Sequence, residues 1–168
     1  MGLVLVLPDV DAAIHEWAPL LKHCPEQFDP VRLLRAFSIV ESDGGRNNMP
    51  RVEPAYAPSH GRYWLTSPIL QADYQRYGLG VAASWGPLQV MYLTARELGY
   101  EGPPWYLADP DLGVRWGAEL LEHRVLPGVG NLRDIADGYN SGSWRDAIVP
   151  GAYIERYIST YQDLEGVA

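Results

Sequence analysis

Apolar residues recur along much of the chain at the three- and four-residue spacing of an amphipathic helix. The first such segment runs from Asp11 to Cys24, where Pro19 is expected to kink the helix or end it early. The second runs from Pro30 to about Glu41, because Asp29 suits the capping position and proline suits the first helical turn. Both segments predict helices with one buried face.

The same spacing predicts five more helices, each begun by a proline or a capping residue. They are expected over residues 67–77, 86–99, 110–125 and 131–139, and from 150 towards the C-terminus. Strand signals are few, and neither a repeat nor a low-complexity linker divides the 168 residues. The pattern therefore predicts one mainly α-helical domain over residues 1–168.

Residues 44–66 interrupt this pattern. Glycines and prolines are frequent there, and Tyr56, Tyr63 and Trp64 lie among them. A segment this long without regular structure is uncommon in a compact domain unless it serves a function. We therefore expect a functional loop.

Composition and charge narrow the classes of function. The formal net charge is −8 and the pI is near 4.9, which argues against a nucleic-acid partner because such a partner needs a basic surface. Cys24 is the only cysteine, so it can form no intrachain disulfide and is interpreted as a small buried apolar residue. No histidine belongs to a His-Glu-x-x-His pair, and no phosphate loop or dinucleotide fingerprint occurs. No metal and no other cofactor are expected.

The carboxyl group of Glu41 stands at the end of the second predicted helix, immediately before the turn Ser42-Asp43-Gly44-Gly45. Glycine favours the left-handed conformation that ends helices. An acidic group at that end faces the negative pole of the helix dipole, which is unfavourable for the fold. That field and any burial would raise the pKa of Glu41 and favour its protonated form, so its position has a chemical reason rather than a structural one.

Three separated patches carry polar side chains beside glycines at the predicted ends of helices. They are Glu41-Ser42, the stretch Ser84–Met91 that contains Gln89, and Gly138-Tyr139-Asn140-Ser141-Gly142. Backbone can approach a ligand closely at a glycine. A carboxyl group, two amides and a phenol suit a sugar substrate, and Trp and Tyr residues offer flat faces for sugar rings.

The order of these patches resembles the lysozyme-like domain of the soluble lytic transglycosylases, whose motifs read Glu-Ser, Gly-Leu-Met-Gln and Ala-Tyr-Asn. Here the motifs read Glu41-Ser42, Gly86-Pro87-Leu88-Gln89 and Gly138-Tyr139-Asn140. Pro87 and Gly138 depart from the family pattern. The resemblance implies a mainly α-helical, lysozyme-like domain of the goose type, with a groove between helices.

Linking segments extend the resemblance. Residues 109–121 are similar to the family's stretch between its second and third motifs, and Arg51-Val52-Glu53-Pro54 resembles a segment of bacteriophage members. The resemblance covers about residues 29–161. Residues 50–84 are longer than in the shortest members, which leaves the rim of the groove and its specificity open.

The family's reaction is cleavage of the β-1,4 bond between N-acetylmuramic acid and N-acetylglucosamine in peptidoglycan. The resemblance implies that Glu41 protonates the leaving oxygen and then acts as a base on the sugar's own 6-hydroxyl, which yields a 1,6-anhydro end. Ser42 would orient Glu41, and Tyr139 would hydrogen-bond near its carboxyl group. Gln89 and Asn140 would bind the N-acetyl sugars.

Two further residues are placed near this site. Met91 is expected to line the groove. Tyr153 belongs to a stripe with Tyr157 and Tyr161 that recurs every four residues, which is more typical of packing, although Tyr153 is within reach of the site. Structural interpretations also stay open for three of the predicted site residues: Gln89 as an exposed helix residue, Tyr139 as an aromatic core residue and Asn140 as a helix C-cap.

Two alternative functions stay open. An inverting hydrolase would use Glu41 with Glu53 or Asp73 as the base for a water molecule, with the carboxyl groups about 6.5–9.5 Å apart. A structural role for Glu53, paired with Arg51 or Arg46, is preferred. The alternative of another class is a non-catalytic glycan-binding or structural component of a virion.

The apolar residues 1–7 lack the basic start of a signal peptide and are too short to span a membrane. They are expected to form a buried strand or to dock on another virion protein. With no visible export signal, the expected role is a bacteriophage lysin that is made in the cytoplasm and acts at the cell wall, either as an endolysin or carried in a virion. Its expected partner is the glycan strand of peptidoglycan.

Overall fold

Helices dominate the computed structural model, which describes residues 6–58, 61–141 and 150–166. The structure is 66% helix, with eight α-helices and few strands in the described part, which confirms the mainly α-helical prediction. The α-helices are α1 (Pro8–Trp17), α2 (Pro30–Ser42), α3 (Arg62–Thr66), α4 (Pro68–Tyr77), α5 (Tyr92–Glu97), α6 (Pro110–Leu120), α7 (Leu132–Ser141) and α8 (Gly151–Asp163). The short helical segments are η1 (Ala18–Leu20), η2 (Pro54–Tyr56), η3 (Gly78–Ala82), η4 (Pro104–Ala108) and the π-helical turn η5 (Leu121–Val125).

Three of the helices begin as the sequence predicts, on a capping side chain that is followed by proline. The Asp29 carboxylate accepts a hydrogen bond of 2.8 Å from the backbone N–H of Arg32 at the start of α2. Ser67 and Asp109 cap α4 and α6 in the same way. Each cap satisfies a backbone N–H that the helix itself leaves unpaired, so these helix starts are set locally.

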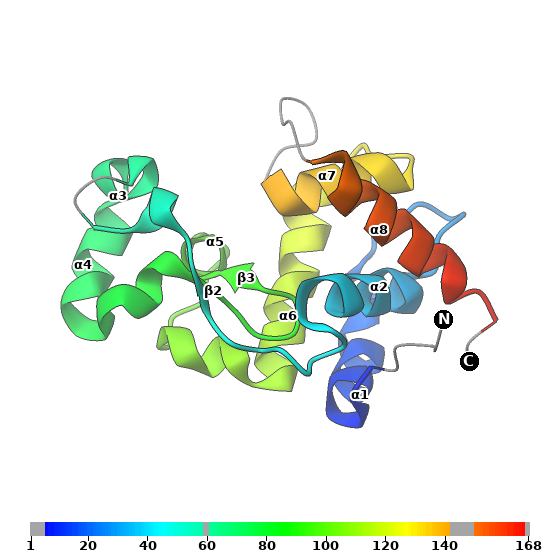
Figure 1. Ribbon diagram of the computed structural model, residues 1–168, viewed down its shortest axis with the longest axis horizontal. Coiled ribbons are helices and arrows are strands. Elements are labelled where there is room, and N and C mark those ends of the chain that lie inside the picture. Colours follow the sequence, from blue (N-terminus) through cyan, green and yellow to red (C-terminus); the bar gives the residue numbers. More distant parts are fainter. Residues whose placement is uncertain (1–5, 59–60, 142–149, 167–168) are drawn as a thin grey trace.

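The helices form two groups around α6 (Figure 1). On one side lie α3, α4 and α5 with the small sheet, and on the other lie α1, α2, α7 and α8. α1 packs on α6, and α2 packs on α8. Leu70 and Tyr92 from the first group and Leu34 and Tyr157 from the second belong to one connected hydrophobic core. A single core joins the two groups.

The structure contains a three-stranded antiparallel sheet, and part of this sheet occupies the first residues of one predicted helix. Its strands are β1 (Arg51–Val52), β2 (Ala83–Trp85) and β3 (Val90–Met91), in the order β1-β2-β3. The prediction of a helix over residues 86–99 is wrong at its start, because residues 86–89 form the turn of the β2–β3 hairpin and α5 begins only at Tyr92. The Gln89 N–H donates to Gly86 O at 3.1 Å, which closes a β-turn. Proline has the same fixed φ in the second position of a β-turn as in a first helical turn, so the Gly-Pro signal fits both.

The hairpin turn lies against two glycines of α6. A Cβ atom at Gly113 would lie 2.7 Å from Pro87 Cδ, and one at Gly117 would lie 2.2 Å from Leu88 Cδ1. The turn itself needs glycine at Gly86, where φ is +77° and a Cβ would lie 2.0 Å from the carbonyl oxygen of Leu107. The close approach of the two backbones therefore depends on residues without side chains.

Two other predicted segments differ in detail. α1 ends at Trp17 and continues as η1, so the first helix starts and ends earlier than the predicted Asp11–Cys24 span, with Pro19 inside the tighter segment. Residues 44–66 are not wholly irregular, because they contain β1, η2 and the unpredicted helix α3. Both departures are short elements whose stability depends on packing rather than on local propensity.

The start of the chain packs on the end of α2. Val6 and Leu7 lie against the core, and the Leu7 N–H donates to Gly44 O at 2.9 Å. The prediction of a buried strand or a docking segment falls mainly on residues 1–5, which lie outside the described residues. In the part of the chain that the structure describes, no helix combines the length and the apolar character that crossing a membrane requires.

The close packing of the hairpin turn predicts how Gly86→Ala changes the stability of the protein. The added Cβ meets the Leu107 carbonyl while φ stays positive, so the free energy of unfolding should fall by about 3 kcal/mol. Gly128→Ala is the matched control, because φ is +81° there and no described atom lies within 4 Å of the added Cβ. Urea denaturation should show a loss of about 1–2 kcal/mol for that control. Equal losses in the two variants would contradict the steric explanation.

Candidate active site

Glu41 lies in the last turn of α2, where the helix ends in three consecutive residues with positive φ. Asp43 (φ 55°) occupies the left-handed capping position, and Gly44 and Gly45 follow it. Asp43 rather than a glycine therefore stops the helix, which short polar side chains tolerate. The Glu41 side chain is only 12% exposed, so its carboxyl group is largely withdrawn from water.

Three side chains from two other elements surround the Glu41 carboxyl group. The Tyr153 hydroxyl of α8 donates to Oε1 at 2.5 Å, and Arg51 of β1 lies 3.9 Å from Oε2. Arg156, one turn after Tyr153, donates to Ile39 O at 3.4 Å and adds a second nearby positive charge. Burial raises the pKa of Glu41 above its ordinary value, while the Tyr153 hydrogen bond and the two arginines act in the opposite direction.

The side chain of Ser42 is buried and hydrogen-bonded within the protein. Its hydroxyl lies 2.7 Å from Pro87 O and 3.0 Å from Ser38 O, and it accepts a hydrogen bond from the Gly45 N–H at 3.0 Å. These hydrogen bonds give Ser42 a structural role. Ser42 ties the end of α2 to the hairpin turn, directly beside Glu41.

Tyr139 also binds the hairpin turn. Its hydroxyl donates to Leu88 O at 2.6 Å, and its ring stacks on Phe37 of α2 with the centroids 4.1 Å apart. Burial and the nearby Glu41 carboxylate raise the pKa of Tyr139 well above its ordinary value. The phenol therefore stays protonated and acts as a donor to the backbone, close to Glu41 but without a hydrogen bond to its carboxyl group.

Gln89 holds the same turn from within. Its Oε1 accepts from the Ser84 hydroxyl at 2.9 Å, and its Nε2 donates to Gly86 O at 3.0 Å and to Met49 O at 3.4 Å. Gln89 has a φ of 47°, a conformation that non-glycine residues seldom adopt. Its amide thus stabilises a strained backbone, which gives Gln89 a structural role, and the sugar contact of Gln89 stays a prediction.

The remaining predicted binding residues are more accessible. Asn140 is exposed on the last turn of α7, which continues to Ser141, so it does not serve as the predicted C-cap. Gly142, the last residue of that patch, lies outside the described residues. Met91 is partly buried on β3, where it pairs with Ser84. Asn140 and Met91 remain available for contacts with a ligand.

The two candidate second carboxylates have different environments. Asp73 is buried in α4, where its Oδ2 accepts from Arg96 Nε at 2.8 Å and from the Tyr92 hydroxyl at 2.9 Å. That ion pair leaves Asp73 a structural role, so it is unsuited to act as a base. Glu53 is exposed at the start of η2, and its N–H donates to Ala82 O at 2.8 Å.

Arg51 and Arg156 are the residues of this site that sequence reasoning missed. Arg51 was expected to pair with Glu53, but the guanidinium donates to the Glu41 carbonyl and approaches the Glu41 carboxyl group instead. Arg46, the other expected partner of Glu53, donates to Asp43 O at 2.9 Å. The pattern Arg-x-Glu-Pro was the only signal that marked Arg51, and no signal marked Arg156.

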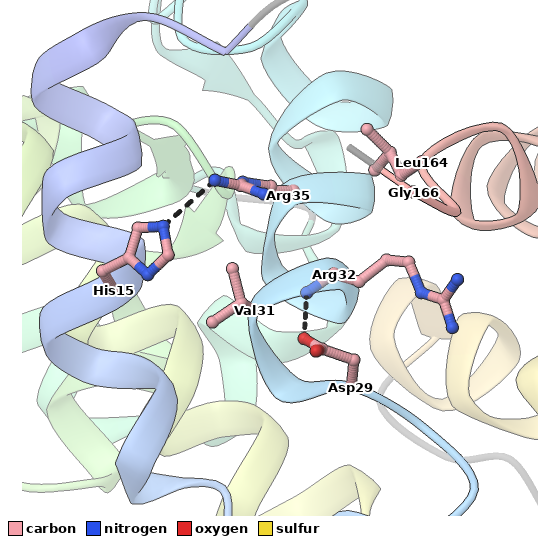
Figure 2. Close-up of a pocket in the computed structure, with 7 residues that line it drawn as sticks. All are labelled: His15, Asp29, Val31, Arg32, Arg35, Leu164 and Gly166. Carbon is pink, nitrogen blue, oxygen red and sulfur yellow. Dashed lines mark hydrogen bonds between the residues drawn. The ribbon is translucent and has the colours of Figure 1, made fainter. Parts of the chain in front are cut away.

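A pocket of about 390 Å³ lies at the other end of α2, with none of the predicted site residues in its lining (Figure 2). Figure 2 shows Arg35 pointing towards His15 of α1, at 3.0 Å, and the Asp29 cap below them. Arg35 also forms a two-bond ion pair with Asp11. His15 and Arg35 thus join α1 to α2, whereas Asp29 caps α2 and Arg32 lies over the ring of Tyr161.

The described residues give no support for a metal site or for a reactive thiol. Within residues 6–58, 61–141 and 150–166, no group of three or more His, Cys, Asp or Glu side chains is arranged to hold a metal ion. Burial raises the pKa of Cys24 to about 11, so the thiol is protonated at neutral pH and is a poor nucleophile.

Comparison with protein-family models, with curated proteins and with solved structures finds no match for this chain. What the residues around Glu41 can do is therefore inferred from their own geometry and chemistry. They combine a largely buried carboxyl group, a phenol that donates to it and two nearby cations. Such a group can exchange a proton with a bound substrate.

Two buried tyrosines that pack on Phe37 give a matched test of the hairpin contact. Tyr139→Phe leaves the Leu88 carbonyl without its donor, so the free energy of unfolding should fall by about 1–3 kcal/mol. The Tyr157 hydroxyl is buried without a hydrogen-bond partner among the described residues, so Tyr157→Phe should be neutral or stabilising. Chemical denaturation measures both. A larger loss in Tyr157→Phe would refute the assigned contact.

The raised pKa of Glu41 predicts a pH-dependent cost to stability. The folded protein binds this proton more tightly than the unfolded chain does, so the free energy of unfolding falls as the pH rises through the interval between the two pKa values. Glu41→Gln keeps the shape and removes the charge. The variant should be more stable than wild type by ~1 kcal/mol at neutral pH. Thermal unfolding at several pH values should show this gap closing below about pH 4.

Proposed function

We propose that this protein is a peptidoglycan-cleaving enzyme of the lytic transglycosylase type, with a lysozyme-like fold and with Glu41 as its general acid and base. The bond cleaved is the β-1,4 link from N-acetylmuramic acid to N-acetylglucosamine, and the product carries a 1,6-anhydro end. The motifs Glu41-Ser42, Gly86–Gln89 and Tyr139-Asn140 support the family assignment, because all three meet at the hairpin turn and the end of α2.

The environment of Glu41 is the observation that carries the proposal. Protonating a glycosidic oxygen at neutral pH needs a carboxylic acid that keeps its proton, and burial of Glu41 favours the protonated form. A helix end without such a purpose would place this side chain in water. Glu41 instead points inward, with only 12% of its side chain exposed.

The second half of the reaction needs the same residue as a carboxylate. Once the proton has moved to the leaving oxygen, Glu41 must accept one from the 6-hydroxyl of the sugar. The Tyr153 hydroxyl at 2.5 Å and Arg51 at 3.9 Å both stabilise the negative charge. Opposing influences on one carboxyl group suit a residue that acts first as an acid and then as a base.

The exposure of the predicted binding residues suggests which of them hold the glycan. Asn140 at the exposed end of α7 and Met91 on β3 are the accessible members of the predicted binding set. Ser42, Tyr139 and Gln89 act indirectly, because they fix the hairpin turn beside the carboxyl group. The partner is the peptidoglycan strand, and the proposed setting is a bacteriophage lysin, released for host lysis or carried in the virion.

A second candidate is an inverting muramidase that uses water. Glu53 is exposed and lies two residues after Arg51, which contacts Glu41, so the segment that carries Glu53 approaches the site. Asp73 suits this role less well, because its carboxylate is already paired with Arg96. An inverting enzyme needs its second carboxylate for water activation, whereas a transglycosylase does not.

The decisive experiment compares clearing of purified cell walls by wild type and by Glu41→Gln. The amide cannot transfer a proton, so the clearing rate should fall by at least about 1,000-fold. Mass spectrometry of the wild-type products should show 1,6-anhydro ends. Glu53→Gln is the matched control and should clear walls at close to the wild-type rate.

The products and the two variants separate the candidates. Reducing ends, together with a large loss in Glu53→Gln, would establish the muramidase instead. Clearing by Glu41→Gln at the wild-type rate would rule out both enzymatic candidates.

A further inference from the structure

The guanidinium of Arg51 contacts Glu41 in two places. One of its nitrogens donates to the backbone carbonyl of Glu41, and another lies 3.9 Å from Oε2 of the carboxyl group. Arg51 belongs to β1 and Glu41 to α2, so these contacts join the last turn of the helix to the sheet. A guanidinium suits this double contact because it presents several donors in one rigid plane.

The strand that carries Arg51 is itself fixed in register. Arg51 pairs with Ser84 of β2, and the Ser84 hydroxyl donates to Gln89. Gln89 in turn donates to Met49 O, two residues before Arg51. A slip of one residue in β1 would turn Arg51 to the other face of the sheet and break both contacts with Glu41.

We propose that Arg51 is a positioning residue, which ties the carboxyl group of Glu41 and the last turn of α2 to strand β1. This inference rests on the proposed function, in which Glu41 transfers protons to and from a bound sugar. Proton transfer requires the carboxyl oxygen within hydrogen-bond reach of the reacting atom. A small displacement of a catalytic group lowers the rate steeply, so an anchor from a second element has a direct effect on catalysis.

Charged and titratable groups from three elements face Glu41 and determine its pH dependence. Arg51 from β1 and Arg156 and Tyr153 from α8 favour the carboxylate, whereas burial, the largest influence, favours the acid. Tyr139 from α7 is close enough for Glu41 to raise its pKa. Removing Arg51 takes away one influence that lowers the pKa of Glu41, so that pKa should rise further.

The test measures the pKa of Glu41 directly, without substrate, by NMR titration of the glutamate carboxyl carbons. Glu41→Gln identifies the signal. Arg51→Gln should raise the pKa of Glu41, and Arg51→Lys should raise it less, because the ammonium keeps the charge but cannot span both contacts. Both variants should clear cell walls more slowly, by on the order of tenfold. In Arg51→Gln the alkaline limb of the pH–rate profile should move to higher pH.

Arg46→Gln is the matched control. Arg46 donates to Asp43 O at the same helix end, and it forms no ion pair with Glu41 among the described residues. This variant should leave the pKa of Glu41 and the pH profile unchanged. An unchanged pKa in folded Arg51→Gln, or an equal shift in Arg46→Gln, would overturn the proposal.

Salt dependence gives a second measurement if Arg51→Gln does not fold. The Arg51 side chain is 46% exposed, so added salt should screen its charge and raise the pKa of Glu41 in the wild-type protein. A pKa of Glu41 that is independent of salt would contradict the influence of the Arg51 charge on that carboxyl group.

A pKa shift in Arg51→Gln without a change in the pH profile of clearing overturns the positioning role and leaves the proposed function intact. Absence of clearing by wild type rejects the proposed function, while the NMR result still tests the contact.

Discussion

The backbone carbonyl groups of the hairpin turn at residues 86–89 are the constraint on which the centre of this protein depends. The turn is buried between α6 and the end of α2, away from the water that would satisfy a surface loop. Ser42, Tyr139 and the side chain of Gln89 provide the donors that water would otherwise supply. Each buried carbonyl left unpaired would cost about 1–3 kcal/mol, so the turn depends for its stability on donors from α2 and α7.

That constraint also explains where Glu41 lies. Its neighbour Ser42 fixes the last turn of α2 to the hairpin, and the stacking of Tyr139 on Phe37 fixes α7 to the same helix. The Glu41 carboxyl group is then held between α8 and β1, in contact with Tyr153. The residues that determine its position are thus mostly not the residues that touch it.

Helix starts were predictable from the sequence because caps such as Asp29-Pro30 act within a few residues. The hairpin was not, since the proline of a β-turn and the proline of a first helical turn satisfy the same local rule, and only packing on Gly113 and Gly117 decides between them. In the candidate site, Glu41 was proposed from its unfavourable position at a helix C-terminus, and the structure shows its side chain only 12% exposed. Arg51 was not paired with Glu41, because the contact joins a strand to a helix end, and a local sequence pattern cannot predict such a tertiary contact.

The influences on the pKa of Glu41 differ in how easily a substitution can alter them. Burial comes from the same packing that forms the core, so it cannot be reduced without a loss of stability. Arg51 and Arg156 lie near the surface, where charge substitutions usually cost little. A protein of this fold can therefore alter the pH at which Glu41 exchanges its proton by substituting exposed cations, while the buried turn and its hydrogen bonds stay intact. Arg51 of β1 and Arg156 of α8 thus lower the pKa of Glu41 from the surface, whereas the burial that raises it comes from the packing of the interior.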